Sequence, residues 1–404
     1  MRSRFAHLVV SVLVTGLLLP VIPGDACTSF LLRHPSGPLM AKNYDWDVAD
    51  GLLVINPRGL AKKAMVSGGV KPVRWTSRYG SVSFNQYGRE FPVGGMNEAG
   101  LAMEVLWLDD TVYPETGDRP SIGTLQWIQY CLDSFRSVAD VVASASELAI
   151  SGPAKLHFIA CDETGNCAVV EFLDGKVVTR SERTLPLPVL TNHSFNDSLE
   201  YLNRTLGYGG EPITPEGTGS LARFARTAKG VHAARSAAGD LPVGDVFAIL
   251  ADVAQPDSTR WSIVYELQKT TVHFKSSGNG EIRTVNLAAL DLDCTAEPLM
   301  LDLLAGGSGD VTSKLVAYSA EKNLETIEAG LKAGKVAATS REAIDARAAY
   351  PEGLSCTFES PKGPRNGSVS QPRSPVSVLP VERFESVGER LVDDPSLEFE
   401  GRCE

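Results

Sequence analysis

The sequence has 404 residues, of which 43% are hydrophobic and 22% charged, a composition typical of a globular protein. This length is ample for one large domain or for two domains of ordinary size. The formal net charge of −11 argues against nucleic acid or an anionic membrane surface as a partner.

Residues 1–26 have the pattern of a signal peptide. Two arginines precede an apolar run over residues 8–19, and the small Gly24 and Ala26 stand at the −3 and −1 positions of a cleavage site before Cys27. The run is shorter than the roughly 20 residues of a membrane span, and no later stretch qualifies as one. We therefore expect a secreted or periplasmic protein without a membrane span. A lipoprotein signal is the alternative, although the aspartate between the two small residues fits it poorly.

Cleavage before Cys27 would give this residue a free α-amino group beside its thiol. A cysteine is a nucleophile as its thiolate, so the thiol needs a base nearby. An α-amine has a reference pKa of about 7.7–8.0 and can accept this proton near neutral pH. The sequence thus indicates an enzyme whose nucleophile and general base belong to one residue.

The chain after Cys27 is predicted to contain groups of strands separated by helices. Short or alternating apolar runs predict strands over residues 28–32, 39–43, 101–108, 156–161, 167–172, 177–179, 187–190, 261–267, 271–274 and 282–290. Helical spacing and cap residues predict helices over residues 125–135, from the cap Ser137 onward, over 220–238 and over 243–253. A turn is predicted over 94–100. This order indicates an α+β protein, with helices covering two antiparallel sheets.

The composition changes along the second half of the chain. We expect residues 27–295 to form the catalytic domain and residues 296–350 to form a helical C-terminal extension, rich in Ala, Glu and Lys after Tyr318. Residues 351–404 are rich in Pro and Ser and are predicted to be a poorly ordered tail.

The seven cysteines suggest an exported protein with one free thiol and the others paired, since the count is odd. Cys27 is the predicted free thiol. Cys161 and Cys167 flank a hairpin turn and are predicted to form a disulfide, whereas the remaining connectivity stays open. The sequence contains no Cys-x-x-Cys and no His-x-x-x-His, so neither a metal site nor a cofactor is expected.

Two charged residues are expected to lie close to Cys27. The predicted hairpin over residues 28–43 returns Lys42 and Asp45 to the start of the domain. A cation near the sulfur favours the thiolate, and a carboxylate can orient the α-amine. On its own, however, a lysine and an aspartate near a turn more often form part of a solvated surface.

Five ordered motifs run from Cys27 to the middle of the chain. They are Cys27-Thr28, Ala41-Lys42-Asn43-Tyr44-Asp45, Gly95-Met96-Asn97-Glu98-Ala99-Gly100-Leu101, Val189-Leu190-Thr191-Asn192 and Ala222-Arg223-Phe224. This set resembles the choloylglycine hydrolase family of linear-amide hydrolases, which includes penicillin V acylases and bile salt hydrolases. The resemblance covers about residues 27–290 and implies an αββα sandwich, the N-terminal nucleophile hydrolase fold.

The resemblance also implies roles for individual residues. Cys27 would be the nucleophile and its α-amine the base, and Asp45 would hold the amine or thiol. Asn192 would donate to the oxyanion, and Arg223 would belong to the catalytic network. Lys42 stands where the family usually has arginine, so the compact charge of an ammonium group would replace the planar guanidinium beside the nucleophile. Without the motifs, Asn192 reads as a turn residue or a glycosylation acceptor, and Arg223 as a helix-surface residue.

Two tryptophans are candidates for substrate binding. Trp107 stands where many bile salt hydrolases have an oxyanion-side asparagine, which makes bile salts a less favoured substrate. With Trp46 it resembles the apolar acyl-binding wall of the Gram-negative penicillin V acylases, although both tryptophans are equally compatible with a purely structural place in the core.

The sequence therefore predicts an exported hydrolase of a small-molecule, non-peptide linear amide with an apolar acyl group. Penicillin V, an N-acyl homoserine lactone or a fatty-acid amide would suit it. A bile salt hydrolase or fatty-acid amide hydrolase of the same family is the alternative, and a non-catalytic exported binding protein is the alternative of another class. A papain-like enzyme is disfavoured because no Cys-Gly-Ser-Cys context occurs. A homo-oligomer is expected from the resemblance alone.

Overall fold

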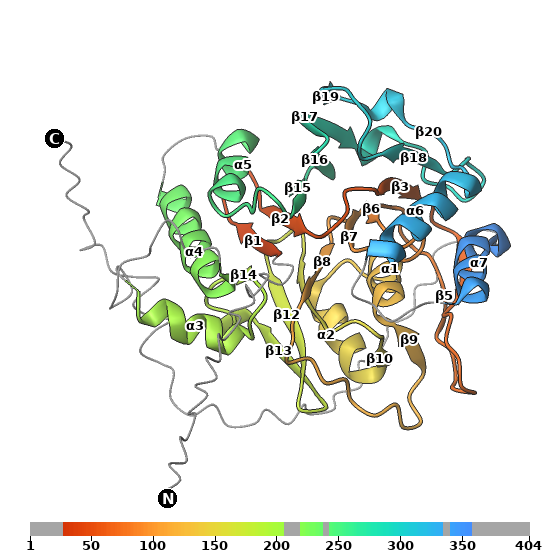
Figure 1. Cartoon of the computed structure of the whole chain (residues 1–404), viewed down its shortest axis with the longest axis horizontal. Helices are drawn as coiled ribbons and strands as arrows, with labels where there is room; N and C mark the ends of the chain where they lie inside the picture. Colours follow the sequence, from red (N-terminus) through yellow and green to blue (C-terminus); the bar gives the residue numbers. More distant parts are fainter. Residues whose placement is uncertain (1–26, 206–218, 237–241, 334–339, 358–404) are drawn as a thin grey trace, which may run out of the picture.

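The computed structural model describes residues 27–205, 219–236, 242–333 and 340–357. The predicted signal peptide and almost all of the predicted tail lie outside these residues. Two large sheets form the centre of the protein (Figure 1). In spatial order, the seven-stranded sheet contains β14 (Val189–Leu190), β1 (Thr28–Leu32), β2 (Leu39–Asp45), β15 (Thr259–Glu266), β16 (Thr271–Ser276), β17 (Asn279–Asn286) and β19 (Gly309–Asp310).

The second large sheet has nine strands, and each neighbouring pair in it is antiparallel. Its order is β13 (Lys176–Ser181), β12 (Cys167–Leu173), β11 (Leu156–Cys161), β8 (Ala102–Trp107), β7 (Gly94–Asn97), β6 (Ser81–Asn85), β3 (Leu52–Asn56), β18 (Leu299–Asp302) and β20 (Val316–Ala317). Two small sheets complete the described strands: β9 (Ser121–Gly123) with β10 (Ala149–Ser151), and β4 (Leu60–Lys63) with β5 (Arg74–Thr76) and β21 (Ser355–Cys356).

Helices cover the outer faces of both large sheets. On the nine-stranded sheet, α1 (Thr124–Ser134) contacts β7 and β8, and α2 (Val138–Glu147) contacts β11 to β13. On the seven-stranded sheet, α4 (Ser220–Ser236) contacts β1 and β14, and α5 (Val243–Asp252) contacts β2 and β15. The remaining helices are α3 (Phe195–Asn203), α6 (Ala320–Ala333), α7 (Arg341–Ala349) and the short 3-10 turns Glu182–Thr184, Leu287–Ala289, Thr312–Lys314 and Tyr350–Gly353.

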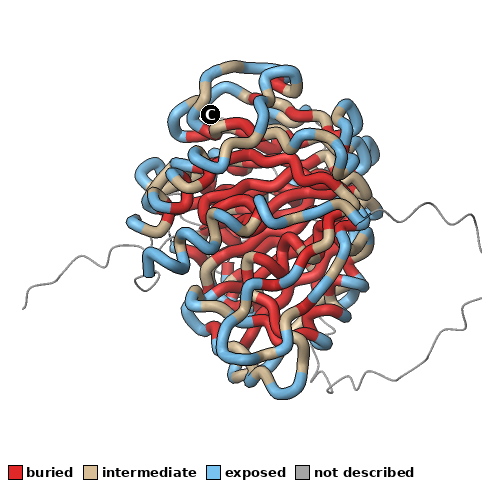
Figure 2. The backbone as a smooth tube through the Cα atoms, turned by 90° about the vertical axis from the view of Figure 1, so that its right-hand side faces the viewer, coloured by how far each residue is buried: buried red, intermediate tan, exposed pale blue. Residues whose placement is uncertain are grey.

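The two sheets pack face to face through a buried core (Figure 2). Phe84 of β6 contacts Trp261 of β15 and Phe274 of β16 across this interface, with ring centroids 6.4 and 5.8 Å apart. Such aromatic packing contributes stability beyond the burial of apolar area. The predicted sandwich of two sheets between helices is therefore confirmed.

Several expected elements were correct and others were not. Strands β1 and β11 have the predicted bounds, and Ser137 caps α2 by accepting a hydrogen bond from the amide of Asp140. The helix expected after residue 296 was wrong near its start, because Leu299–Asp302 forms β18, which pairs with β3. A short apolar run cannot distinguish a strand from a buried helix by its periodicity alone. Whether residue 296 is a domain boundary stays a prediction.

The turn expected over residues 94–100 contains a buried strand, β7. Glycine is required there by close packing: a Cβ atom on Gly95 would lie 2.4 Å from the carbonyl oxygen of Val82, and one on Gly94 would lie 2.2 Å from the carboxylate of Glu104. Strands β3 to β6 and helix α3 were not predicted at all.

The cysteine predictions were only partly correct. The predicted Cys161–Cys167 disulfide is present, and a second one joins Cys294 to Cys356. Cys27 is free, but Cys131 is free as well and lies buried in α1. The odd number of cysteines therefore did not identify one free thiol, because an apolar core accommodates an unpaired cysteine as a small hydrophobic residue.

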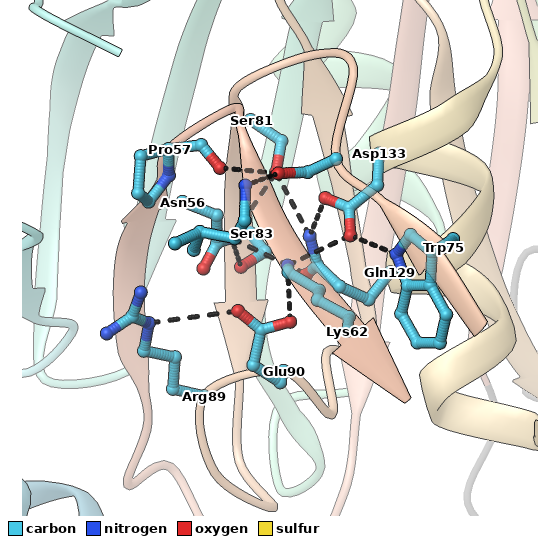
Figure 3. A network of polar contacts seen from close by, with 12 residues as sticks. Asn56, Pro57, Lys62, Trp75, Ser81, Ser83, Arg89, Glu90, Gln129 and Asp133 are labelled. Atoms are coloured by element: carbon cyan, nitrogen blue, oxygen red, sulfur yellow. Dashed lines mark hydrogen bonds and ion pairs between the residues drawn. The ribbon is translucent and has the colours of Figure 1, made fainter. Parts of the chain in front are cut away.

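A buried polar network joins β4, β6 and α1 (Figure 3). Lys62 pairs with Glu90 at 2.5 Å and with Asp133 at 2.9 Å, and neither the lysine nor Asp133 has an exposed side chain. Trp75 and Gln129 donate further hydrogen bonds to Asp133, at 2.7 and 2.8 Å. Burial raises the pKa of Asp133 to about 6 even though Lys62 opposes the shift. Arg89 also lies 3.9 Å from Glu90, so two buried carboxylates are balanced by one lysine and one arginine.

Candidate active site

The β1–β2 hairpin places Cys27 beside the end of β2. The turn closes through a hydrogen bond from the amide of Gly37 to the carbonyl of His34 at 2.9 Å, and Gly37 has a positive φ of 117°. The register pairs Thr28 with Asn43. The Cys27 thiol consequently donates to the carbonyl oxygen of Asp45, with a separation of 3.8 Å.

Cys27 is 4% exposed and lies in a strongly desolvated position. Burial raises the pKa of its thiol to about 11, and the nearby Lys42 and Arg223 oppose this rise. Asp45 raises the pKa further through its charge. The thiol of the full-length chain is therefore protonated at neutral pH, and it would act as a nucleophile only with a base that removes its proton.

Asp45 is buried at the end of β2 and is held by two donors, one at the start of the neighbouring strand β15 and one in the loop before it. Thr259 donates to one carboxylate oxygen at 2.5 Å, and Gln255 donates to the other at 3.1 Å. A register shift between β15 and β2 occurs next to Thr259. Burial raises the pKa of Asp45 to about 6, and Arg223 is the strongest opposing influence.

Arg223 links three segments that are distant in the sequence. One guanidinium nitrogen donates to the Cys27 carbonyl and to the Thr28 hydroxyl, both at 2.7 Å, and the other donates to Asn192 Oδ1 at 3.0 Å. Its side chain is fully buried, so it is not a helix-surface residue. Burial lowers the pKa of Arg223 to about 10, a value at which the guanidinium is still charged at neutral pH.

Asn192 follows β14 and is half-buried between two sheets. Its Nδ2 donates to the carbonyl of Trp107 at 2.8 Å, and its backbone amide donates to Ser220 Oγ at 2.8 Å. With Arg223 bound to its Oδ1, the amide is fixed in one orientation. A side-chain amide has two N–H donors, so one donor remains beyond the bond to Trp107.

Lys42 is fully buried and forms an ion pair that the sequence analysis did not foresee. Its Nζ lies 3.1 Å from Glu104 Oε2 and also donates to the carbonyl of Val105. Tyr265 donates to the other oxygen of Glu104 at 2.6 Å. Burial raises the pKa of Glu104, and Lys42 opposes this rise. The cation near Cys27 is therefore balanced by a carboxylate from the facing sheet.

Glu104 had a signal in the sequence that we did not use. It is a charged residue within the otherwise apolar run of β8, and such a residue is almost never buried without a partner. The other residues missed by the sequence analysis are Thr259, Gln255 and Thr28. Gln255 lies in a loop and Thr259 at the start of β15, both more than 200 positions after Asp45, and no local sequence pattern marks either residue.

An apolar cavity opens beside Cys27. Its volume is about 420 Å³, within the range of small-molecule sites. Trp46 and Trp107 both line it, and their ring centroids are 6.2 Å apart. Both tryptophans also pack against the core, so the binding and structural interpretations are compatible. The Trp107 indole donates to Asp109 at 2.7 Å.

Helices of the C-terminal extension form part of the cavity wall. Leu331 of α6 and Arg347 of α7 line the same cavity as Cys27. Within the described ranges, no group of His, Cys, Asp or Glu side chains is arranged to hold a metal ion. In the same part of the chain, no helix is long and apolar enough to cross a membrane.

Comparisons with known proteins agree with this geometry. A model of the family described as acyl-coenzyme A:6-aminopenicillanic acid acyl-transferase matches residues 32–280. A penicillin V acylase of Pectobacterium atrosepticum is 28% identical over 336 residues, which cover 72% of this chain and 88% of that protein.

Solved structures give the same result. The penicillin V acylase from Agrobacterium tumefaciens has a TM-score of 0.63 at 28% identity, covering 72% of this chain and 98% of that one. A mutant of the conjugated bile acid hydrolase from Clostridium perfringens has a TM-score of 0.58 at 18% identity, covering 70% of this chain and 98% of that one. This second likeness supports the fold alone.

These matches confirm the predicted family, the N-terminal nucleophile hydrolase fold and the class of enzyme, and the non-catalytic alternative is not retained. The chain belongs to the acyl-coenzyme A:6-aminopenicillanic acid acyl-transferase family and is a hydrolase of carbon–nitrogen bonds in linear amides, related to the penicillin V acylases.

Proposed function

We propose that this chain is the precursor of an exported amidase with Cys27 as its N-terminal nucleophile. The amidase would cleave a small non-peptide amide with an apolar acyl group, as in penicillin V or an N-acyl homoserine lactone. The observation that carries the proposal is the convergence of Asp45, Asn192 and Arg223 on Cys27 beside one apolar cavity.

The first half-reaction forms a thioester. Once residues 1–26 are removed, the α-amine of Cys27 accepts the thiol proton, and the thiolate attacks the amide carbonyl carbon. The negative charge that develops on the carbonyl oxygen is stabilised by the free N–H of Asn192 Nδ2. The protonated α-amine then gives its proton to the leaving nitrogen, the carbon–nitrogen bond breaks, and the amine product departs.

The second half-reaction releases the acid. The α-amine, again neutral, removes a proton from water, and the resulting nucleophile attacks the thioester carbonyl. The carbon–sulfur bond breaks, the carboxylic acid leaves and Cys27 is regenerated. Arg223 acts on both halves as a positioning residue, because it holds the Cys27 carbonyl and the Asn192 amide at the same time.

The electrostatics of the site suit this sequence of steps. A thiol with a pKa of about 11 is unreactive in the uncut chain, so activity would depend on the amine that cleavage creates. Lys42 favours the thiolate by its charge, while its pairing with Glu104 limits that effect. Trp46 and Trp107 offer flat apolar surfaces to an aromatic or alkyl acyl group.

Two measurements test the proposal. The intact mass of the exported protein should correspond to a chain that begins at Cys27 without a lipid. The purified mature protein should hydrolyse penicillin V or N-acyl homoserine lactones, and Cys27→Ser should lose this activity while it retains the wild-type melting temperature. Unchanged turnover in Cys27→Ser would refute the nucleophile assignment.

A further inference from the structure

The cavity beside Cys27 carries a single formal charge. Apart from the Cys27 thiol, the described side chains that line it are neutral except for Arg347, and no Asp or Glu is among them. The chain as a whole, in contrast, has 49 acidic residues and a net charge of −11. The cavity is thus an apolar space with one cation in its wall.

Arg347 has no carboxylate partner in the described part of the chain. It is half-buried in α7, and its guanidinium carbon lies 4.7 Å from the centroid of the Phe91 ring. Burial lowers the pKa of Arg347, which reflects the loss of hydration around its charge. A partly desolvated cation without a counter-ion costs free energy, and an anion entering the cavity would recover it.

Arg341, on the same helix, provides a direct contrast. It is exposed and pairs with Glu328 at 2.6 Å and with Asp345 at 2.9 Å, and it is not part of the cavity wall. One arginine of α7 is therefore used in surface ion pairs, whereas the other is left facing the apolar space that contains the nucleophile.

A second polar group of the cavity also lacks a partner. Ser121 of β9 is 5% exposed, and its hydroxyl has no hydrogen-bond partner among the described residues. It lines the same cavity as Arg347. The Trp46 indole N–H and the Gln126 side-chain amide of the same wall also lack partners among the described residues, and Arg347 is the charged donor of the described wall.

We propose that the preferred acyl group carries a carboxylate at the end remote from the scissile amide, and that Arg347 binds this carboxylate. This inference rests on the proposed function, since it places the amide carbonyl at Cys27. The hydrocarbon part of the acyl group lies against Trp46, Trp107 and Leu331, and the carboxylate reaches the guanidinium. Arg347 lies beyond residues 32–280, so this preference belongs to the C-terminal extension and not to the segment that the family model matches.

The test compares two series of amides with one common amine. One series has methyl-ended acyl chains, the other has carboxylate-ended chains of matched length, and the length is varied in both. We expect the mature enzyme to hydrolyse the carboxylate-ended series with the higher kcat/KM. In Arg347→Gln the ratio between the series should fall by about tenfold or more, mainly through KM, because a charge-assisted contact is lost.

Two further variants serve as controls. Arg341→Gln should leave the ratio unchanged, because Arg341 does not line the cavity. Arg347→Lys keeps the charge and should retain part of the preference. The proposal is overturned if wild type prefers methyl-ended chains, or if the ratio is the same in wild type, Arg347→Lys and Arg347→Gln. Failure of every amide in both series would overturn the proposed function as well, whereas turnover of the methyl-ended series alone would overturn only this inference.

Discussion

The ion pair between Lys42 and Glu104 joins the two sheets next to Cys27, and its removal tests how charge is balanced there. The side chains are 0% and 1% exposed, and their charged atoms lie 3.1 Å apart. Lys42→Met would leave the Glu104 carboxylate without its cation, and Glu104→Gln would leave Lys42 without its anion. Breaking one side of a buried pair costs about 3–5 kcal/mol of unfolding free energy.

The double variant Lys42→Met/Glu104→Gln removes both charges. It keeps an acceptor oxygen for the Tyr265 hydroxyl, so it should be less destabilised than the sum of the single variants, by about 0.5–3 kcal/mol. Chemical denaturation of all four proteins at pH 7 measures this coupling. Additive losses, within about 0.5 kcal/mol, would show that the pair does not act as a unit.

The same variants predict a pH dependence with a defined sign. Burial holds the pKa of Glu104 above its ordinary value, and Lys42 opposes that rise. Without Lys42 the pKa of Glu104 rises further, so the folded state binds more protons than the unfolded state above the ordinary carboxyl range. The stability of Lys42→Met should therefore fall as pH increases from about 4 toward neutral, more steeply than that of wild type.

Three more predictions concern the site and its support. Burial raises the pKa of Asp45 to about 6, so if its carboxylate orients the amine, kcat/KM should show a second fall near pH 6, below the fall caused by protonation of the α-amine. Asp45→Asn should have low activity and keep only the fall that belongs to the α-amine. A fall near pH 6 that persists in Asp45→Asn would exclude Asp45 as its source. In Arg223→Lys, an ammonium group replaces the planar guanidinium that binds the Cys27 carbonyl and the Asn192 amide at the same time, so kcat should fall about a hundredfold in steady-state assays. A wild-type kcat in this variant would contradict the positioning role of Arg223. Lys62→Met removes the cation that Glu90 and Asp133 share, so chemical denaturation should show an unfolding free energy lower by about 3–5 kcal/mol. A loss below about 1 kcal/mol would show that the network is dispensable for stability.

The local patterns of the sequence were sufficient for the elements with strong periodicity. Strands β1 and β11, the capped helix α2 and the Cys161–Cys167 disulfide all follow from spacing over a few residues. The elements that were missed have different causes. Strand β7 is built from glycines that are selected by close packing against Val82 and Glu104, and a glycine-rich run reads locally as a turn.

The sequence by itself determined the nucleophile candidate and its chemistry, because a cysteine after a cleavage-site pattern and a set of ordered motifs are local properties. Only the tertiary structure decided which residues pair with the charged groups near Cys27 and which residues line the cavity. Lys42 is paired with Glu104, Asp45 with Thr259 and Gln255, and the cavity wall includes Arg347. These contacts join the two sheets, the start of β15 and the C-terminal helices, segments that are up to about 320 positions apart. Burial and pairing depend on which faces meet across the sandwich, and no periodicity within one segment contains that information.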